Sequence, residues 1–212
     1  MDSTPIIHIV EDDHSLRAAL ESLFHSVDFR TRAYGSVADF IRDHDPQRPG
    51  CLVLDVRLPG TSGLEFQDQM QTRGVRLPVV LMTGHGDIPM SVRGMKAGAV
   101  DFLAKPFRDQ DMLDAVATAI GKDAEQRLED RNAAHLAGRF AALSSRERQV
   151  MLLVTAGKMN KQVAGELAIS EVTVKIHRGS AMRKMGARTL PDLVRMVESL
   201  HLPESSAANT TV

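Results

Sequence analysis

The chain has 212 residues, 43% of them apolar and 25% charged, a composition typical of a globular protein with one large domain or two small ones. It has no stretch of roughly 18 uncharged apolar residues, so no membrane-spanning helix is expected, and its acidic N-terminus is unlike a secretory signal peptide. The single cysteine, Cys51, excludes an internal disulfide and a cysteine zinc cluster, which fits a protein of the reducing cytoplasm.

The net charge of −1 conceals an uneven distribution along the chain. Residues 1–120 carry 12 Lys and Arg against 17 Asp and Glu, whereas residues 121–212 carry 14 against 10. An acidic half joined to a basic half predicts two domains with different partners, and a polyanion is the expected partner of the second.

The first 120 residues alternate short apolar runs with segments of helical periodicity. The apolar runs predict strands at residues 6–10, 29–34, 51–54, 79–82 and 100–104. Helical spacing of apolar residues follows each run, at residues 16–27, 37–41, 63–71, 88–97 and 109–120. Five successive βα units predict an α/β domain, a doubly wound five-stranded parallel sheet with helices on both faces.

The remaining residues predict an all-helical arrangement. Residues 121–140 are highly charged and fit either a helical linker that continues the fifth helix or a flexible connector. Four helices are then expected within residues 141–201: Ser144, Asn160 and Ser170 are the expected N-terminal caps of the first three, and residues 189–192 start the last. The polar tail, residues 202–212, is expected to fray.

Chemically distinctive side chains follow four of the five predicted strands. Ligands of an open parallel sheet bind at the carboxyl ends of its strands, so these side chains are expected to converge there. Several acids at one edge repel one another unless a cation neutralises them, and their oxygen ligands favour Mg²⁺. The residues concerned are Glu11, Asp12, Asp13, Asp55, Thr83 and Lys105.

A phosphoryl group fits this combination of acids and a single ammonium group. Asp55, alone at the end of the central strand, is the candidate nucleophile and would form an acyl phosphate. Lys105 would screen the phosphoryl oxygens, and the Thr83 hydroxyl would donate to one of them. Taken singly, each of these residues also fits an ordinary helix cap or turn.

Four segments resemble the receiver domain of two-component response regulators, a flavodoxin-like fold. They are residues 9–13, 54–63, 82–86 and 102–107, and the resemblance covers residues 1–120. It implies that Asp55 accepts a phosphoryl group from a histidine of a sensor kinase. It also implies that Lys105–Pro106 is a cis peptide bond.

The same resemblance implies a metal site and a switch. Mg²⁺ would be held by Asp12, Asp55 and the backbone carbonyl of Arg57, with Glu11, in place of the usual aspartate, acting through water. Phosphorylation would draw Thr83 inward, and Phe102 would fill the space that it leaves. The surface affected would be the fourth helix, fifth strand and fifth helix, the expected face of a homodimer.

Residues 160–185 predict a helix-turn-helix, whose second helix can enter the major groove of DNA. Residues 141–201 carry ten Lys and Arg against five Asp and Glu, the sign of charge that phosphate contact needs. A short helical bundle with a modest basic excess that binds no nucleic acid is the alternative.

Residues 143–150, 157–164 and 169–177 resemble the LuxR-type DNA-binding domain, and the whole chain is similar to the FixJ/StyR-like branch of response regulators, with a LuxR/NarL-type output domain. The resemblance places one group on the recognition helix: Val174, Lys175, Ile176, His177 and Arg178. It places a second group toward the phosphate backbone: Lys158, Asn160, Lys161 and Thr173. Gly179 stands where some relatives present a long side chain to the bases, which leaves the base preference open.

The sequence therefore predicts a phosphorylation-activated transcriptional regulator of the cytoplasm that binds promoter DNA as a dimer. Its expected partners are a sensor histidine kinase, double-stranded DNA and a second copy, with RNA polymerase a further candidate and no membrane.

One alternative is an aspartate-nucleophile phosphohydrolase of the haloacid dehalogenase type, but the position of its second aspartate holds Arg57, which cannot exchange protons at neutral pH. Only self-directed phosphoryl transfer and slow self-dephosphorylation are thus expected as chemistry. The other alternative is a receiver whose output domain binds protein or RNA.

Overall fold

The computed structural model describes residues 4–84 and 88–200, and the chain divides into two compact units, Met1–Arg127 and Leu128–Val212. Residues 85–86 of the receiver-like motif and the predicted tail, residues 202–212, lie outside the described residues. Among the described helices, none is long and apolar enough to cross a membrane.

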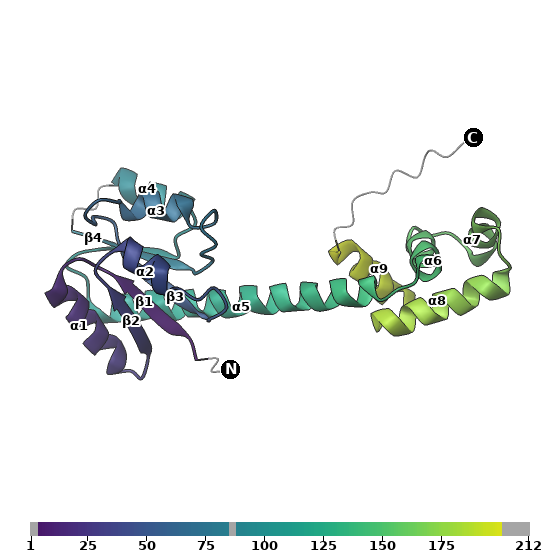
Figure 1. Ribbon diagram of the computed structural model, residues 1–212, viewed down its shortest axis with the longest axis horizontal. Coiled ribbons are helices and arrows are strands. Elements are labelled where there is room, and N and C mark those ends of the chain that lie inside the picture. The colour runs from purple at the N-terminus through teal and green to yellow at the C-terminus, as the bar shows by residue number, and fades with distance from the viewer. Residues whose placement is uncertain (1–3, 85–87, 201–212) are drawn as a thin grey trace. The chain divides into compact units, whose positions relative to one another are not determined.

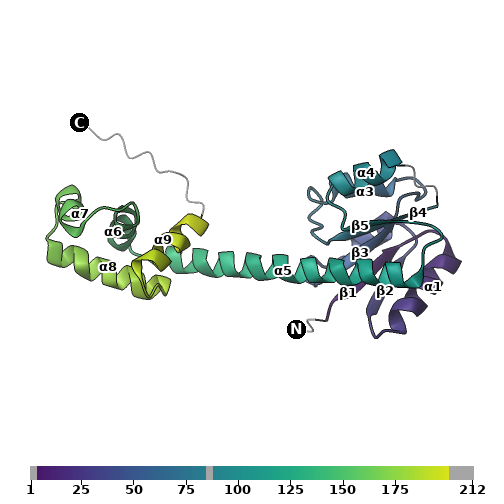
Figure 2. The same ribbon diagram turned by 180° about the vertical axis from the view of Figure 1, so that it is seen from behind.

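The first unit contains the predicted parallel sheet, with strand order β2-β1-β3-β4-β5 (Figures 1 and 2). All four pairs of neighbouring strands are parallel, which confirms the doubly wound architecture. The strands are β1 (Ile6–Val10), β2 (Arg30–Tyr34), β3 (Gly50–Asp55), β4 (Val79–Thr83) and β5 (Asp101–Ala104). Asp55 and Thr83 are thus the last residues of their strands rather than the first residues beyond them.

Helices cover both faces of this sheet because alternate strand residues point to opposite sides. Leu52 and Leu54 of β3 pack with α2 and α3 on one face, and Cys51 and Val53 pack with α1 and α5 on the other. The helices are α1 (His14–His25), α2 (Val37–Asp43), α3 (Gly63–Gln69), α4 (Ile88–Lys96) and α5 (Asp109–Ala141).

Helix α5 extends over both the predicted fifth helix and the predicted linker, residues 121–140. Beyond the apolar contacts, which extend to Ile120, the carboxylate of Asp123 is buried and accepts a hydrogen bond from the Gly50 amide at 2.9 Å. Arg127 pairs with Asp123 at 2.8 Å and donates to the carbonyl oxygen of Arg48 at 2.7 Å. These polar contacts extend the first unit past residue 120, to Arg127.

The second unit packs helices around one apolar core. The core is formed by α6 (Ser145–Thr155), α7 (Asn160–Leu167), α8 (Glu171–Met185) and α9 (Leu190–Ser199), and Leu136 and Phe140 near the end of α5 pack against it. Ser144 and Ser170 cap their helices as predicted, and Thr189 caps α9. Asn160 does not cap α7: it is the first helical residue, and Met159 donates its amide to the Gln162 side chain instead.

The turn between α7 and α8 is as short as a helix-turn-helix requires. Ala168 ends α7 in the left-handed conformation, with φ of 51°, and Ser170 accepts a hydrogen bond from the Thr173 amide at 3.0 Å to start α8. The predicted helix-turn-helix is therefore confirmed.

Candidate functional site

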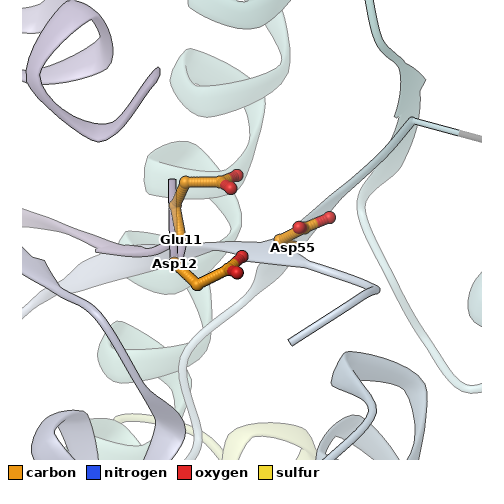
Figure 3. A group of neighbouring side chains, drawn as sticks. All are labelled: Glu11, Asp12 and Asp55. Carbon is orange, nitrogen blue, oxygen red and sulfur yellow. The ribbon is translucent and has the colours of Figure 1, made fainter. Parts of the chain in front are cut away.

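Three carboxylates meet at the carboxyl end of the sheet in the first unit. Val10 of β1 lies opposite Leu54 of β3 in the parallel register, so the residues that follow them are neighbours. Oxygen atoms of Glu11, Asp12 and Asp55 lie within 4.8 Å of one another, and Figure 3 shows the three side chains turned toward the same space. Glu11 and Asp55 are buried, whereas Asp12 is exposed.

Lys105 reaches this cluster from the end of β5. Its ammonium nitrogen lies 2.6 Å from Oε2 of Glu11 and 3.2 Å from Oδ2 of Asp55. Burial raises the pKa of the Glu11 carboxyl above its usual value, and the charge of Asp55 adds to the rise, while the hydrogen bond from Lys105 opposes it. The ammonium group therefore lies between the carboxylates of two buried acids and pairs with both.

The donor set fits a hard divalent cation. Oδ1 of Asp55 is buried and accepts no hydrogen bond within the part of the chain that the structure describes. A buried carboxylate oxygen without a partner is costly, and a cation would remove that cost. All the candidate ligands are oxygens, which Mg²⁺ prefers. A cavity of about 390 Å³ opens beside the cluster and is lined by Asp12 and Arg57, among others.

The acids that follow β1 are not equivalent. Asp13, which the sequence places with the other strand-end acids, caps α1: its carboxylate accepts hydrogen bonds from the amides of Ser15 and Leu16 at 2.7 and 3.1 Å. The Arg17 guanidinium donates to the backbone carbonyls of Glu11 and Asp12 at 2.6 and 3.2 Å and so fixes the loop. Arg17 carries no sequence signal beyond its helical position, so this role could not be predicted from the sequence.

Thr83 and Phe102 lie on the neighbouring strands β4 and β5. Thr83 is fully buried, and its carbonyl accepts a hydrogen bond from the Lys105 amide at 2.7 Å. Phe102 is half-buried and packs against the apolar core below α4. The peptide bond Lys105–Pro106 is cis.

Gly63, at the start of α3, is a further site residue, beyond those predicted from the sequence. A Cβ atom there would lie 2.2 Å from the carbonyl oxygen of Asp55, so any side chain would displace the end of β3. A glycine as the first helical residue after a strand-end loop was the available signal.

The second unit exposes one face of α8. Val174 is fully buried in the core with Ala181 and Met185, so its prediction as a DNA contact is wrong: a helix of this domain must bury one face, and Val174 lies on it. Ile176 is 64% exposed and Lys175 is also exposed.

The remaining predicted contacts vary in their surroundings. His177, Arg178 and Asn160 are half-buried, and Lys161 is exposed. The Thr173 hydroxyl lies 2.8 Å from that of Ser170. The ammonium group of Lys158 forms an ion pair with Glu166.

A polar cluster fixes the back of α8 against α6. Glu147 accepts hydrogen bonds from Lys184 at 2.7 Å and from Ser180 at 2.6 Å. Together with the amide of Ser144, these donors lower the pKa of the Glu147 carboxyl to about 2. Lys184 is therefore engaged within the domain.

Comparison with known families covers both units. The family model described as "Response regulator receiver domain" matches residues 7–117, and the one described as "Bacterial regulatory proteins, luxR family" matches residues 141–197.

Similar proteins match over nearly the whole chain. Nodulation protein W of Bradyrhizobium diazoefficiens is 50% identical over 98% of this chain and 91% of its own length. The transcriptional regulatory protein FixJ of Azorhizobium caulinodans is 42% identical over 92% of each chain. The solved structure of the response regulator StyR is 45% identical with a TM-score of 0.83, covering 92% of this chain and 98% of that one.

Proposed function

The chain belongs to the response regulators that join a receiver domain to a LuxR-type DNA-binding domain, and from that premise we propose that phosphorylation of Asp55 controls its binding to DNA. It is a transcriptional regulator rather than a typical enzyme. The observation that carries the proposal is the buried Asp55 carboxylate, which lies between two further acids and an ammonium group.

Mg²⁺ is the cofactor that we assign to this cluster. Asp12, Asp55 and the backbone carbonyl of Arg57 would hold it, and Glu11 would act through water. When bound, it would neutralise charge on the carboxylates and on the incoming phosphoryl oxygens.

The side chain of Asp55 supplies the nucleophile. One of its carboxylate oxygens attacks the phosphorus of a phosphohistidine on the sensor kinase, and the bond from phosphorus to the histidine nitrogen breaks, with the electron pair leaving on nitrogen. Lys105, whose ammonium nitrogen lies 3.2 Å from Asp55, stabilises the negative phosphoryl oxygens. Its contact with Glu11 keeps it oriented toward the site.

The acyl phosphate is also the signal. It adds about two negative charges at the strand ends, and the hydroxyl of Thr83 then donates to a phosphoryl oxygen. The movement of Thr83 leaves space into which the Phe102 ring turns. This changes the surface formed by α4, β5 and α5, where Val92 and Met95 are 44% and 46% exposed.

Pairing through that surface makes the phosphorylated protein a dimer. Two recognition helices then bind DNA half-sites about one helical turn apart, and the linkage raises affinity without new contacts. Lys175, Ile176, His177 and Arg178 lie on the recognition helix, and Lys158, Asn160, Lys161 and Thr173 lie toward the phosphates. We place phosphorylation and DNA binding in the cytoplasm, where a sensor kinase delivers the phosphoryl group and RNA polymerase is a further candidate partner.

Labelling with radioactive acetyl phosphate tests the assignment. The wild-type protein should take up about one phosphoryl group in Mg²⁺ and none after chelation, because the acids then repel the donor. Asp55→Asn should abolish labelling. Asp13→Asn is the matched control, since asparagine also caps helices, and it should label normally. Stoichiometric labelling of Asp55→Asn would refute the assignment.

A further inference from the structure

The outward face of α8 carries apolar side chains where a solvated helix would carry polar ones. Val172 is 67% exposed and Ile176 is 64% exposed. Their spacing of four residues places them on one side of the helix. The buried residues Val174, Ala181 and Met185 define the opposite side. Both exposed side chains are β-branched and rigid, and both lie in the first two turns of the helix.

The same face is open and flanked by positive charge. Gly179 lies one turn beyond Ile176, and a Cβ atom added there would meet nothing within 4 Å, so no part of the described chain covers the face at that point. Lys175 and Arg183 are exposed beside it. An apolar strip between basic side chains fits a polyanion that presents apolar groups between its charges.

We propose, on the basis of the proposed DNA-binding function, that Val172 determines sequence specificity by packing against the C5 methyl group of a thymine. The thymine methyl is the apolar group that the major groove displays, and apolar side chains recognise it by contact. The N-terminal residues of a recognition helix are those that reach base edges. Val172 thereby extends the base-reading surface one turn toward the N-terminus from Ile176.

The helix geometry predicts the spacing of the bases. Residues four apart are separated by about 6 Å along a helix axis. Base pairs are stacked about 3.4 Å apart, so methyl groups touched by Val172 and Ile176 belong to base pairs one or two steps apart. Gly179 adds no side chain to the face, so base preference is expected to be concentrated at these thymines.

A randomised duplex library tests the proposal. The full chain, treated with acetyl phosphate and Mg²⁺, should enrich duplexes with two thymines at that spacing in each half-site. In a synthetic copy of the enriched duplex, replacing the thymine opposite Val172 by uracil removes only its methyl group. Wild-type affinity should then fall roughly fourfold, the value of one buried methyl group.

The variant Val172→Ala makes the test specific to this side chain. Because Val172 is exposed, the variant should fold normally, bind the thymine duplex about as weakly as wild type binds the uracil duplex, and show no further loss with uracil. Val27→Ala, which truncates a valine that is 43% exposed on the receiver, should retain the full uracil effect.

Two other outcomes separate this proposal from the function on which it rests. The role of Val172 alone is overturned if a duplex is enriched but uracil at every thymine leaves its affinity unchanged. The same conclusion follows if uracil weakens binding equally in wild type and in Val172→Ala. Failure to enrich any duplex contradicts the proposed DNA-binding function and this proposal with it.

Discussion

The three consecutive acids that follow β1 lie in different surroundings. Glu11 is buried and paired with Lys105, Asp12 is exposed at the cavity, and Asp13 caps α1. The direction of each side chain, set by the end of β1 and the start of α1, decides which of them joins Asp55. A sequence pattern can place all three at a strand end, but it cannot assign these roles.

Removal of the Lys105 ammonium group should slow phosphorylation. In Lys105→Ala the phosphoryl oxygens lose their only positive side chain in the described cluster, and Glu11 and Asp55 are left to repel each other. Labelling by acetyl phosphate should slow by about 100-fold, the usual effect of losing one charge-stabilising donor. Lys122→Ala, an exposed change on α5, is the control and should label at the wild-type rate. Equal rates for the two variants would contradict the role of Lys105.

His8 gives the first unit a predictable response to acid. It is only 3% exposed on β1 and stacks on Tyr34, with ring centres 5.9 Å apart. Burial, helped by the nearby His44 and Arg32, lowers the pKa of His8 to about 4. The unfolded chain, with a histidine pKa near 6.5, binds the proton more readily, so stability is full above about pH 6.5 and declines toward pH 4.

Thermal unfolding measured between pH 4 and pH 7 checks this response. The temperature at which half of the first unit is unfolded should decrease as the pH is lowered in wild type, and it should decrease less in His8→Leu. Glu147 of the second unit contributes to stability over a lower pH range than His8, because its carboxyl pKa is about 2 in the folded chain. The stability that Glu147 contributes is lost only as the pH falls below about 4.5. An identical slope in wild type and His8→Leu would show that His8 is not the group responsible.

At the scale of elements, α5 is held at its exit from the receiver by polar contacts. Asp123 is 4% exposed and binds the amide of Gly50, the first residue of the central strand β3. Gly50 leaves no room for a side chain, because a Cβ there would lie 1.9 Å from the Ile6 carbonyl oxygen. The helix and the strand that ends in Asp55 are therefore fixed to each other.

Loss of this contact should be measurable by hydrogen exchange. Asp123→Ala leaves the Gly50 amide without its acceptor, which costs about 1–3 kcal/mol for a buried donor, and it also removes the carboxylate that pairs with Arg127. Amides at Gly50 and over residues 121–127 should exchange faster, and the first unit should unfold at a lower temperature. Glu125→Ala, an exposed change on the same turn, should leave both unchanged. Wild-type protection of Gly50 in Asp123→Ala would contradict the contact.

Local patterns predicted most elements of the fold. Apolar runs predicted the five strands, and caps such as Ser144 and Ser170 marked helix starts, because these signals act over a few residues. Long-range contacts were not predictable: Asp123 meets Gly50 across 73 positions of sequence. For that reason the sequence of residues 121–140 does not decide between a helical linker and a flexible connector. Val174 was misplaced because the rotation of α8 about its axis depends on the core it packs against.

Candidate site residues were easier to predict in the receiver than in the second unit. Parallel strands deliver their last residues to one edge, so Glu11, Asp55 and Lys105 could be brought together by topology alone. In the second unit only exposure separates a DNA contact from a core residue. Val172 was overlooked because a valine on a helix is more often buried.

At the scale of the whole molecule, an acidic receiver and a basic helical unit share one chain and one long helix, α5. The receiver holds a buried carboxylate, Asp55, beside two further acids, and the second unit exposes basic side chains on α8, the second helix of its helix-turn-helix. We propose that dimerisation links the receiver to DNA binding, because two linked recognition helices bind one site more tightly than either helix alone.

The measurement that tests this account most directly is the affinity of the full chain for its enriched duplex, with and without acetyl phosphate in Mg²⁺, in wild type and in Asp55→Asn. The account predicts that the phosphodonor tightens binding by wild type at least tenfold and forms a dimer on the duplex, while Asp55→Asn stays at the unphosphorylated affinity. Equal tightening in both proteins, or none in a wild type that is fully phosphorylated, would contradict it.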